Sequence, residues 1–276
     1  MSRDRAATTA LAVFGATAVI HLTALLTGAT LLAHATKPAL MPLLAAHVLL
    51  RGGPPLLAGA LLLGCGGDTL LQVGGDTVFL LGMGSFAAGH VCYLLLFARH
   101  GSPGGARTYR LAALYAGAWL TVVVLLWPGL DERLRVPVAL YSLLLTAMAL
   151  GATRARLWAG AGGALFLLSD TLLASGLAKW PQAPAPQFWV MLTYIAAQGL
   201  LAHGVLRCHG EPEGPGRRTE GPGRRTEGPG RRSEGAGRTE EAGRTEEAGR
   251  SPADPSTGPG SDQSRTAASA STTPKP

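Results

Sequence analysis

Two aspartates, Asp68 and Asp170, lie inside long apolar stretches of the sequence. An ionised side chain at the centre of a bilayer costs at least roughly 2.5–3.5 kcal/mol, so such groups tend to face a protein interior and serve a function. Two carboxyl groups that meet there can divide the roles of proton donor and anion, as in glycosidases. The pair indicates acid–base catalysis or proton transfer; the simpler interpretation is that each carboxyl only hydrogen-bonds a neighbouring helix.

Other polar side chains share these apolar stretches: Lys37, His90, Tyr93, Tyr141, Tyr194 and Gln198. His90 and Tyr93 are three residues apart, and Tyr194 and Gln198 are four apart, so each pair is expected to share a helix face. A zinc hydrolase built from His21, His90 and the two aspartates is an open alternative. The sequence has no HExxH or CxxC motif, however, and we expect neither a metal nor another cofactor.

The elements that must position these groups are predicted to be membrane-spanning helices, because each span needs about 20 mostly apolar residues. Residues 1–208 are rich in Leu and Ala and contain few charges. The apolar runs predict an all-α, polytopic membrane bundle with about eight spans: 8–30, 37–50, 54–71, 76–98, 109–127, 136–152, 156–178 and 187–206. The second run is the shortest, contains Pro38 and Pro42, and places Lys37 at its start.

Charge patterning tests this count. Residues 1–208 contain thirteen Lys and Arg and six Asp and Glu, whereas the remaining residues have equal numbers of basic and acidic side chains and no net charge. The pI of 9.8 therefore comes from the apolar part. Basic residues beside apolar spans favour contact with an anionic membrane surface, and we expect no nucleic-acid partner. With eight spans and both termini cytoplasmic, nine of the thirteen basic residues fall on the inside, as the positive-inside rule requires. We therefore predict a multi-pass cell-membrane protein with both ends cytoplasmic.

In this topology Asp68 and Asp170 each lie about fourteen residues beyond the inner end of a span, which places both in the outer half of the membrane. Gly64, Gly66 and Gly67 precede the first aspartate. Small residues let helices approach closely, so we expect close packing around Asp68.

The sequence divides into two predicted regions, an apolar domain over residues 1–208 and a tail over residues 209–276. The tail repeats the unit EGPGRRT from Glu213 and then decays into shorter units. It has no apolar heptad pair, and Pro and Gly recur in the early repeats, which excludes a coiled coil. Too little apolar surface is available to offset chain entropy, so the tail is predicted to be disordered.

Several motifs occur in an order that resembles the YhhN / TMEM86 lysoplasmalogenase family. They are Thr36-Lys-Pro38, Gly67-Asp68, Phe79 to Tyr93, Val136 to Tyr141, Gly163 to Asp170, and Thr193 to Gln198. The resemblance covers roughly residues 8–206 and implies an eight-helix membrane bundle. It also implies that Asp68 and Asp170 are the family's acidic positions, and that its other polar positions are Lys37, His90, Tyr93, Tyr141, Ser169, Tyr194 and Gln198. A second Gly-Gly-Asp ends at Asp76; we prefer Asp68, because its spacing fits and Asp76 falls at a loop.

The resemblance implies hydrolysis of the vinyl ether bond of lysoplasmalogens to a fatty aldehyde and a glycerophospho-base. Acid cleaves such bonds, so the hypothesis is that the two aspartates supply a protonated carboxyl group and an anion. Lys37 is expected to meet the phosphate of the lysophospholipid substrate, with membrane lipids as surroundings. One alternative is a transporter or lipid-binding protein that uses the same carboxylates for proton coupling. Another is a hydrolase of a different ether or lysolipid.

Overall fold

The computed structural model describes residues 2–100, 105–155 and 157–209, and this part of the chain is all-α. Its helices are α1 (Arg3–Thr27), α2 (Thr30–Leu50), α3 (Pro55–Val73), α4 (Asp76–His100), α5 (Ala106–Leu126), α6 (Glu132–Ala155), α7 (Leu157–Leu177) and α8 (Pro186–His209). Each overlaps one of the eight predicted apolar runs. The predicted all-α class and the order of its helices are therefore confirmed.

Seven of these helices are long and apolar enough to cross a membrane, which confirms a multi-span membrane protein. The exception is α2, which contains Lys37 and two prolines. The predicted disordered tail falls outside the described residues beyond His209. Its disorder, and the cytoplasmic location of both ends, stay predictions.

The predicted start of α2 at residue 37 was wrong, because the helix begins at Thr30 and continues through both prolines. Pro42 has no N–H and leaves the carbonyl of Pro38 without its helical partner. Cys65 of α3 donates its thiol to that carbonyl oxygen at 3.2 Å. A neighbouring helix thus supplies the missing bond, as is common in membrane bundles. Lys37 consequently lies inside the helix, nearly two turns from its start.

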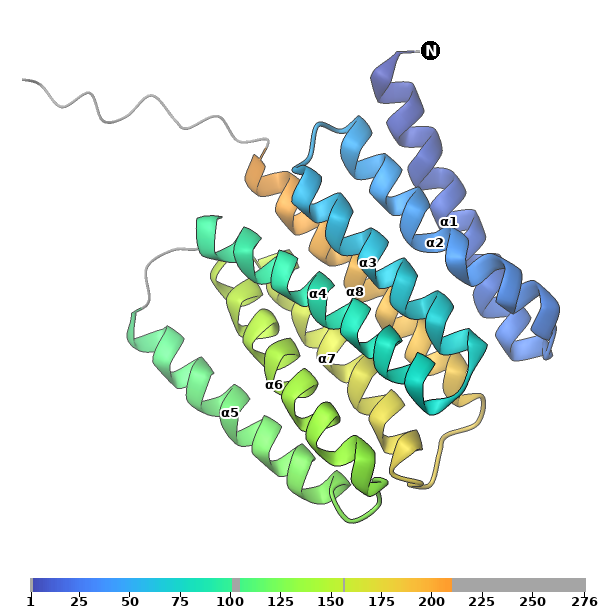
Figure 1. The fold of residues 1–276 in the computed structure, drawn as a ribbon. Coiled ribbons are helices and arrows are strands. Elements are labelled where there is room, and N and C mark those ends of the chain that lie inside the picture. Colours follow the sequence, from blue (N-terminus) through green and yellow to red (C-terminus); the bar gives the residue numbers. More distant parts are fainter. Residues whose placement is uncertain (1, 101–104, 156, 210–276) are drawn as a thin grey trace, which may run out of the picture. The chain divides into compact units, whose positions relative to one another are not determined.

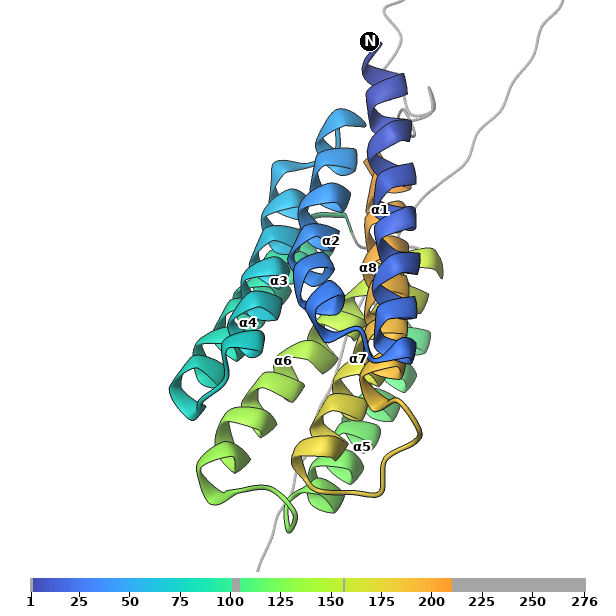
Figure 2. The same cartoon turned by 90° about the vertical axis from the view of Figure 1, so that its right-hand side faces the viewer.

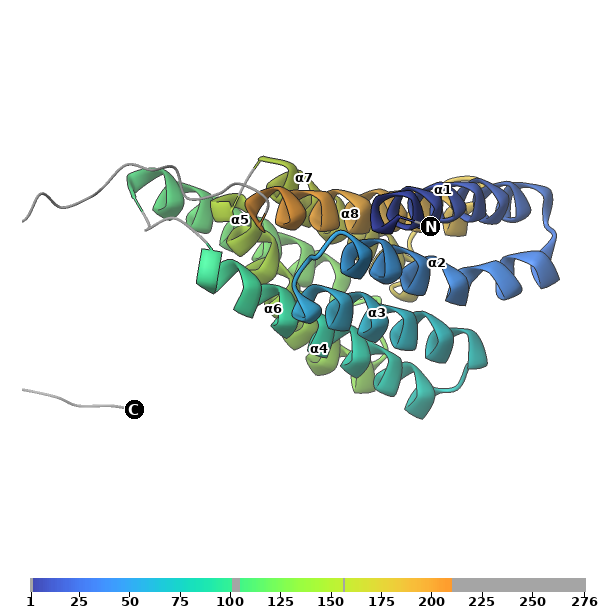
Figure 3. The same cartoon turned by 90° about the horizontal axis from the view of Figure 1, so that it is seen from above.

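Helices that follow one another in the chain pack side by side from α1 to α4 and from α6 to α8, and α4 packs directly on α6 (Figure 1). The most central helix is α8, which contacts α1, α2, α3, α6 and α7. Figure 2 shows α1 running along α8. Helix α5 contacts only α6 and α7 to any extent and lies at the far end from α1 (Figure 3). It is thus peripheral to the bundle.

The glycines before Asp68 lie at close contacts between helices. A Cβ added to Gly66 would lie 2.8 Å from the Ser85 hydroxyl of α4, and one on Gly67 would overlap the Phe86 ring. A Cβ on Gly64 would lie 3.0 Å from the hydroxyl oxygen of Tyr194 on α8. The expected close packing is confirmed. It brings α4 and α8 against the turn of α3 that carries Asp68.

Candidate active site

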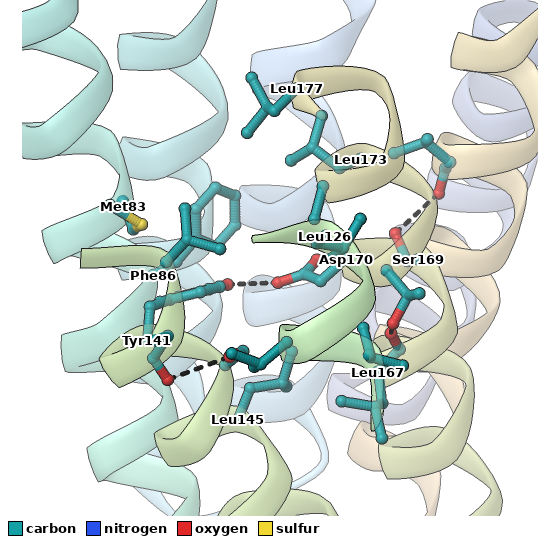
Figure 4. Close-up of a pocket in the computed structure, with 18 of the residues that line it drawn as sticks. Met83, Phe86, Leu126, Tyr141, Leu145, Leu167, Ser169, Asp170, Leu173 and Leu177 are labelled. Atoms are coloured by element: carbon teal, nitrogen blue, oxygen red, sulfur yellow. Dashed lines mark hydrogen bonds between the residues drawn. The ribbon is translucent and has the colours of Figure 1, made fainter. Parts of the chain in front are cut away.

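An apolar cavity with about 1230 Å³ of empty space, including its open part, lies among helices α2 to α8. Figure 4 shows part of it, with Tyr141 directed at Asp170 and with Met83, Phe86, Leu173 and Leu177 among its walls. Six of the nine predicted site residues line this cavity: Lys37, Asp68, Tyr141, Ser169, Asp170 and Tyr194. The structure therefore brings the two aspartates, which come from α3 and α7, to one chamber.

Asp68 forms an ion pair within the cavity wall. Its Oδ1 lies 3.3 Å from Nζ of Lys37, and the two side chains are 5% and 16% exposed. The Tyr194 hydroxyl lies beside the carboxylate. The second oxygen, Oδ2, is buried and has no hydrogen-bond partner among the described residues. A buried carboxylate oxygen without a partner is costly, and in a site of this kind it is free to accept a bond from water or from a ligand.

Asp170 has different partners. The Tyr141 hydroxyl of α6 donates a hydrogen bond to its Oδ2, and Nε2 of His90 on α4 lies 3.1 Å from the same hydroxyl oxygen. Because the phenol proton is directed to Asp170, His90 must donate its Nε2–H to Tyr141. The His90 and Phe166 rings pack edge to face. No ion pair to Asp170 occurs within the described part of the chain. Its carboxyl group is thus held by one neutral donor, the Tyr141 hydroxyl.

A second hydrogen-bonded chain leads toward Asp68. The Tyr93 hydroxyl donates to Oε1 of Gln198 at 2.6 Å, and Nε2 of Gln198 lies 3.4 Å from the Tyr194 hydroxyl. His90, Tyr93 and Gln198 are almost fully buried and do not line the cavity. Both chains begin on α4, at positions one turn apart. These three residues therefore lie behind the side chains that face the cavity.

Ser169 also has a structural partner, because its hydroxyl donates to the carbonyl of Val190 on α8 at 3.0 Å. This bond joins α7 to α8 directly beside Asp170. The hydroxyl lines the cavity with its proton already engaged.

Both carboxyl groups lie in the same half of the bundle. Asp68 is five residues before the end of α3, and Asp170 is seven residues before the end of α7. At 1.5 Å per residue these positions are roughly 8 and 10 Å from the helix ends. These positions are similar along the two helices, as predicted, and their depth in the membrane stays a prediction. Which membrane face this half adjoins stays a prediction.

The apolar wall on the α5 side was not predicted. A helical stripe of α5 lines the cavity: Ala118, Trp119, Val122, Val123 and Leu126. Of α5, only Leu126 is buried. The indole N–H of Trp119 donates to the Ser142 hydroxyl of α6 at 3.0 Å. This helix thus closes the chamber and contributes little to the core, a role that its run of apolar residues did not indicate.

Arg135 also lines the cavity, although the sequence indicated only a basic loop residue there. Its position seven residues before Ser142, which also lines the cavity, puts both on one helix face and was the available signal. Among the described residues, no three His, Cys, Asp or Glu side chains come together as metal ligands. His21, named for the alternative zinc site, bonds to Thr36 at 2.9 Å and does not line the cavity.

Helices and cavity together define a polytopic membrane protein in which two carboxyl groups, that of Asp68 buried and that of Asp170 half-buried, face an apolar chamber. Residues 32–205 match the YhhN family, and the chain belongs to this family.

Two kinds of curated relative are similar to it. It is 33% identical over 154 residues to the lysoplasmalogenase of Mycobacterium tuberculosis (strain CDC 1551 / Oshkosh), covering 52% of this chain and 58% of that protein. It is 35% identical over 149 residues to lysoplasmalogenase TMEM86B of Homo sapiens, covering 54% and 62%. The chain thus spans about three fifths of the length of these relatives. No solved structure matches it significantly.

Proposed function

We propose that this protein is an ether hydrolase that cleaves the vinyl ether bond of lysoplasmalogens, with choline or ethanolamine headgroups. The products are a fatty aldehyde and the glycerophospho-base. The observation that carries the proposal is that two carboxyl groups with different partners, Asp68 and Asp170, line one apolar cavity. The printed names of the curated relatives support the substrate class. We place the activity in residues 1–208, with residues 209–276 outside the catalytic unit.

The chemistry needs an acid, an anion and water. A proton added to the β-carbon of the vinyl ether gives an oxocarbenium ion. The oxygen of water then bonds to the α-carbon, and the water's proton returns to the carboxylate. The resulting hemiacetal collapses to aldehyde and alcohol as a proton moves to the glycerol oxygen. One water is consumed and the acid is regenerated, so the reaction requires no oxidant or cofactor.

We assign the acid to Asp170 and the anion to Asp68. Lys37 stabilises the charged form of Asp68, which can then face the developing cation and accept a hydrogen bond from water through Oδ2. Asp170 has no cation beside it within the described residues, so its neutral form is the one that suits an apolar chamber. With Oδ2 engaged by Tyr141, Oδ1 is the oxygen that would hold the proton.

The test is turnover of a vinyl ether lysolipid by purified Asp68→Asn and Asp170→Asn. A general acid contributes about 10²–10⁴-fold, so each variant should lose at least about 100-fold in kcat. Asp76→Asn is the matched control, because Asp76 is exposed at the start of α4 and should leave turnover unchanged. Near-normal turnover in either site variant would sink the mechanism. Failure of the wild-type protein to release aldehyde would favour the transporter or lipid-binding alternative.

A further inference from the structure

Two cations belong to the described lining of the cavity, and they are not equivalent. Lys37 is paired with Asp68 at 3.3 Å, so its charge is already matched inside the protein. Arg135, in the first turns of α6, is the other. Its nearest acid is Glu132, at 3.8 Å from Nη1, and the Glu132 side chain is 89% exposed. Such solvent-exposed pairs contribute little. Arg135 therefore brings a largely unmatched positive charge to the cavity.

The backbone and an aromatic ring hold the Arg135 guanidinium in place. Its Nε donates to the carbonyls of Trp127 and Leu130, each at 3.2 Å, and its Cζ lies 6.0 Å from the centre of the Trp127 ring. The Nη groups make no hydrogen bond to any described residue, and the side chain is 28% exposed. A planar guanidinium with free terminal N–H groups is well suited to bidentate recognition of a phosphate.

The position along the bundle also fits. Arg135 is three residues from the start of α6, whereas Asp170 is seven residues from the end of α7, and these two helix ends meet at the same end of the bundle (Figure 1). Arg135 is thus nearer the helix ends by about 6 Å. Charged lipid headgroups lie at the ends of membrane spans and acyl chains lie deeper. A lysolipid oriented as in the bilayer would place its phosphate at Arg135 and its vinyl ether near the aspartates.

We propose that Arg135, and not Lys37, binds the phosphate of the lysophospholipid and so gives the cavity its preference for phosphate-bearing ether lipids. The inference rests on the proposed function for the identity of the lipid. The binding preference itself does not require hydrolysis. An alkyl lysolipid with a phosphate binds more tightly than one without, and Arg135 causes the difference.

The experiment uses non-cleavable lipids, so that it does not depend on turnover. Binding of a 1-O-alkyl lysophosphocholine and of the corresponding 1-O-alkylglycerol is measured on the full chain in detergent, for wild type, Arg135→Gln, Arg135→Lys and Arg133→Gln. The ratio of the two dissociation constants is the readout. Because each ratio comes from one sample, partial loss of folded protein cancels. Arg133 is exposed and does not line the cavity, so its substitution removes the same charge two residues away.

We expect the wild type and Arg133→Gln to prefer the phosphate-bearing lipid. Arg135→Gln should reduce this preference by about tenfold, as for one lost charge-assisted hydrogen bond, and Arg135→Lys should retain part of it. An unchanged ratio in Arg135→Gln would overturn the proposal. So would displacement of both lipids alike by inorganic phosphate alone, which would reassign the site to a free anion.

Aldehyde release from a vinyl ether substrate, measured in parallel, separates the two proposals. A preference lost in Arg135→Gln without any hydrolysis by wild type would keep the phosphate site and remove the enzyme assignment. Hydrolysis by wild type, with the same lipid preference in Arg135→Gln as in wild type, would keep the enzyme assignment and remove the phosphate site.

Discussion

At the scale of single residues, the Tyr141 hydroxyl offers a direct test of the mechanism, because it joins His90 to the carboxyl group proposed as the acid. Tyr141→Phe removes the donor to Asp170 and preserves the ring. A hydrogen bond to a group that becomes charged contributes about 1.5–3 kcal/mol. We therefore expect kcat to fall about ten- to hundredfold, with a smaller change in KM. Steady-state kinetics on a vinyl ether lysolipid measures both.

Tyr109→Phe is the control for this substitution, because Tyr109 lies on α5 with its side chain 74% exposed. It should behave as wild type. If Tyr141→Phe retained full kcat, the Asp170 carboxyl group would not depend on this hydrogen bond.

The ion pair between Lys37 and Asp68 predicts a second effect, on stability. Lys37→Met leaves a buried carboxylate without its cation, and removing one partner of a buried pair costs up to roughly 3–5 kcal/mol. The double variant Lys37→Met with Asp68→Asn removes both charges and should recover most of this loss. Thermal unfolding in detergent gives the comparison. Equal melting temperatures for the single and double variants would mean that the two side chains are not coupled. Neither variant should be active.

Residue types in the sequence were sufficient to select six polar side chains that line the cavity, although not Arg135. Position along the helices was sufficient to match Asp68 with Asp170. What the sequence could not provide was the rotation of each helix about its axis. His90 and Tyr93 share a face of α4, as their spacing predicted, yet they end two separate hydrogen-bonded chains. Partners for these two residues come from α6 and α8, and long-range contacts of this kind leave no local pattern.

At the scale of elements, the α3–α4 contact depends on Gly67, where any side chain would meet the Phe86 ring. Gly67→Ala should lower the free energy of unfolding by about 1–3 kcal/mol, as overpacking in a core does. It should also reduce turnover, since Asp68 is the next residue. Gly59→Ala on the same helix has open space around the new Cβ and should be neutral or slightly stabilising. Similar melting temperatures for the two variants would show that α4 can shift to accommodate the added methyl group without loss of stability.

Helix existence was predictable from apolar run length, whereas helix ends were less so. Helix α1 ends at Thr27, where Gly28 adopts a left-handed conformation with φ of 71°, and α2 then resumes at Thr30. The two prolines obscured this start. Their effect on the backbone is offset by Cys65, which lies on a different helix. A boundary that depends on a tertiary contact cannot be read from local sequence.

At the scale of the whole molecule, the course of α2 decides how many times the chain crosses the membrane. Its composition sets it apart from the seven helices that are long and apolar enough to span. Its geometry favours crossing, because its 21 residues extend about 32 Å, close to the roughly 30 Å of bilayer hydrocarbon. At one end, Arg3 of α1 donates to the carbonyl of Leu49 at 3.0 Å, so α1 begins where α2 finishes. The turn at Ala29 lies at the opposite end of both helices.

We therefore predict eight crossings, with both termini on the cytoplasmic side. The measurement is labelling of single cysteines by a membrane-impermeant maleimide in intact cells, after replacement of Cys65, Cys92 and Cys208. Ala29→Cys should react from outside, whereas Gly52→Cys should react only after permeabilisation, because the positive-inside rule places the Arg51 turn in the cytoplasm. Gly105→Cys, between α4 and α5, is a second position that eight crossings place inside. Labelling of Ala29→Cys and Gly52→Cys from the same side would make α2 re-entrant, leave seven crossings, and place the two termini on opposite faces.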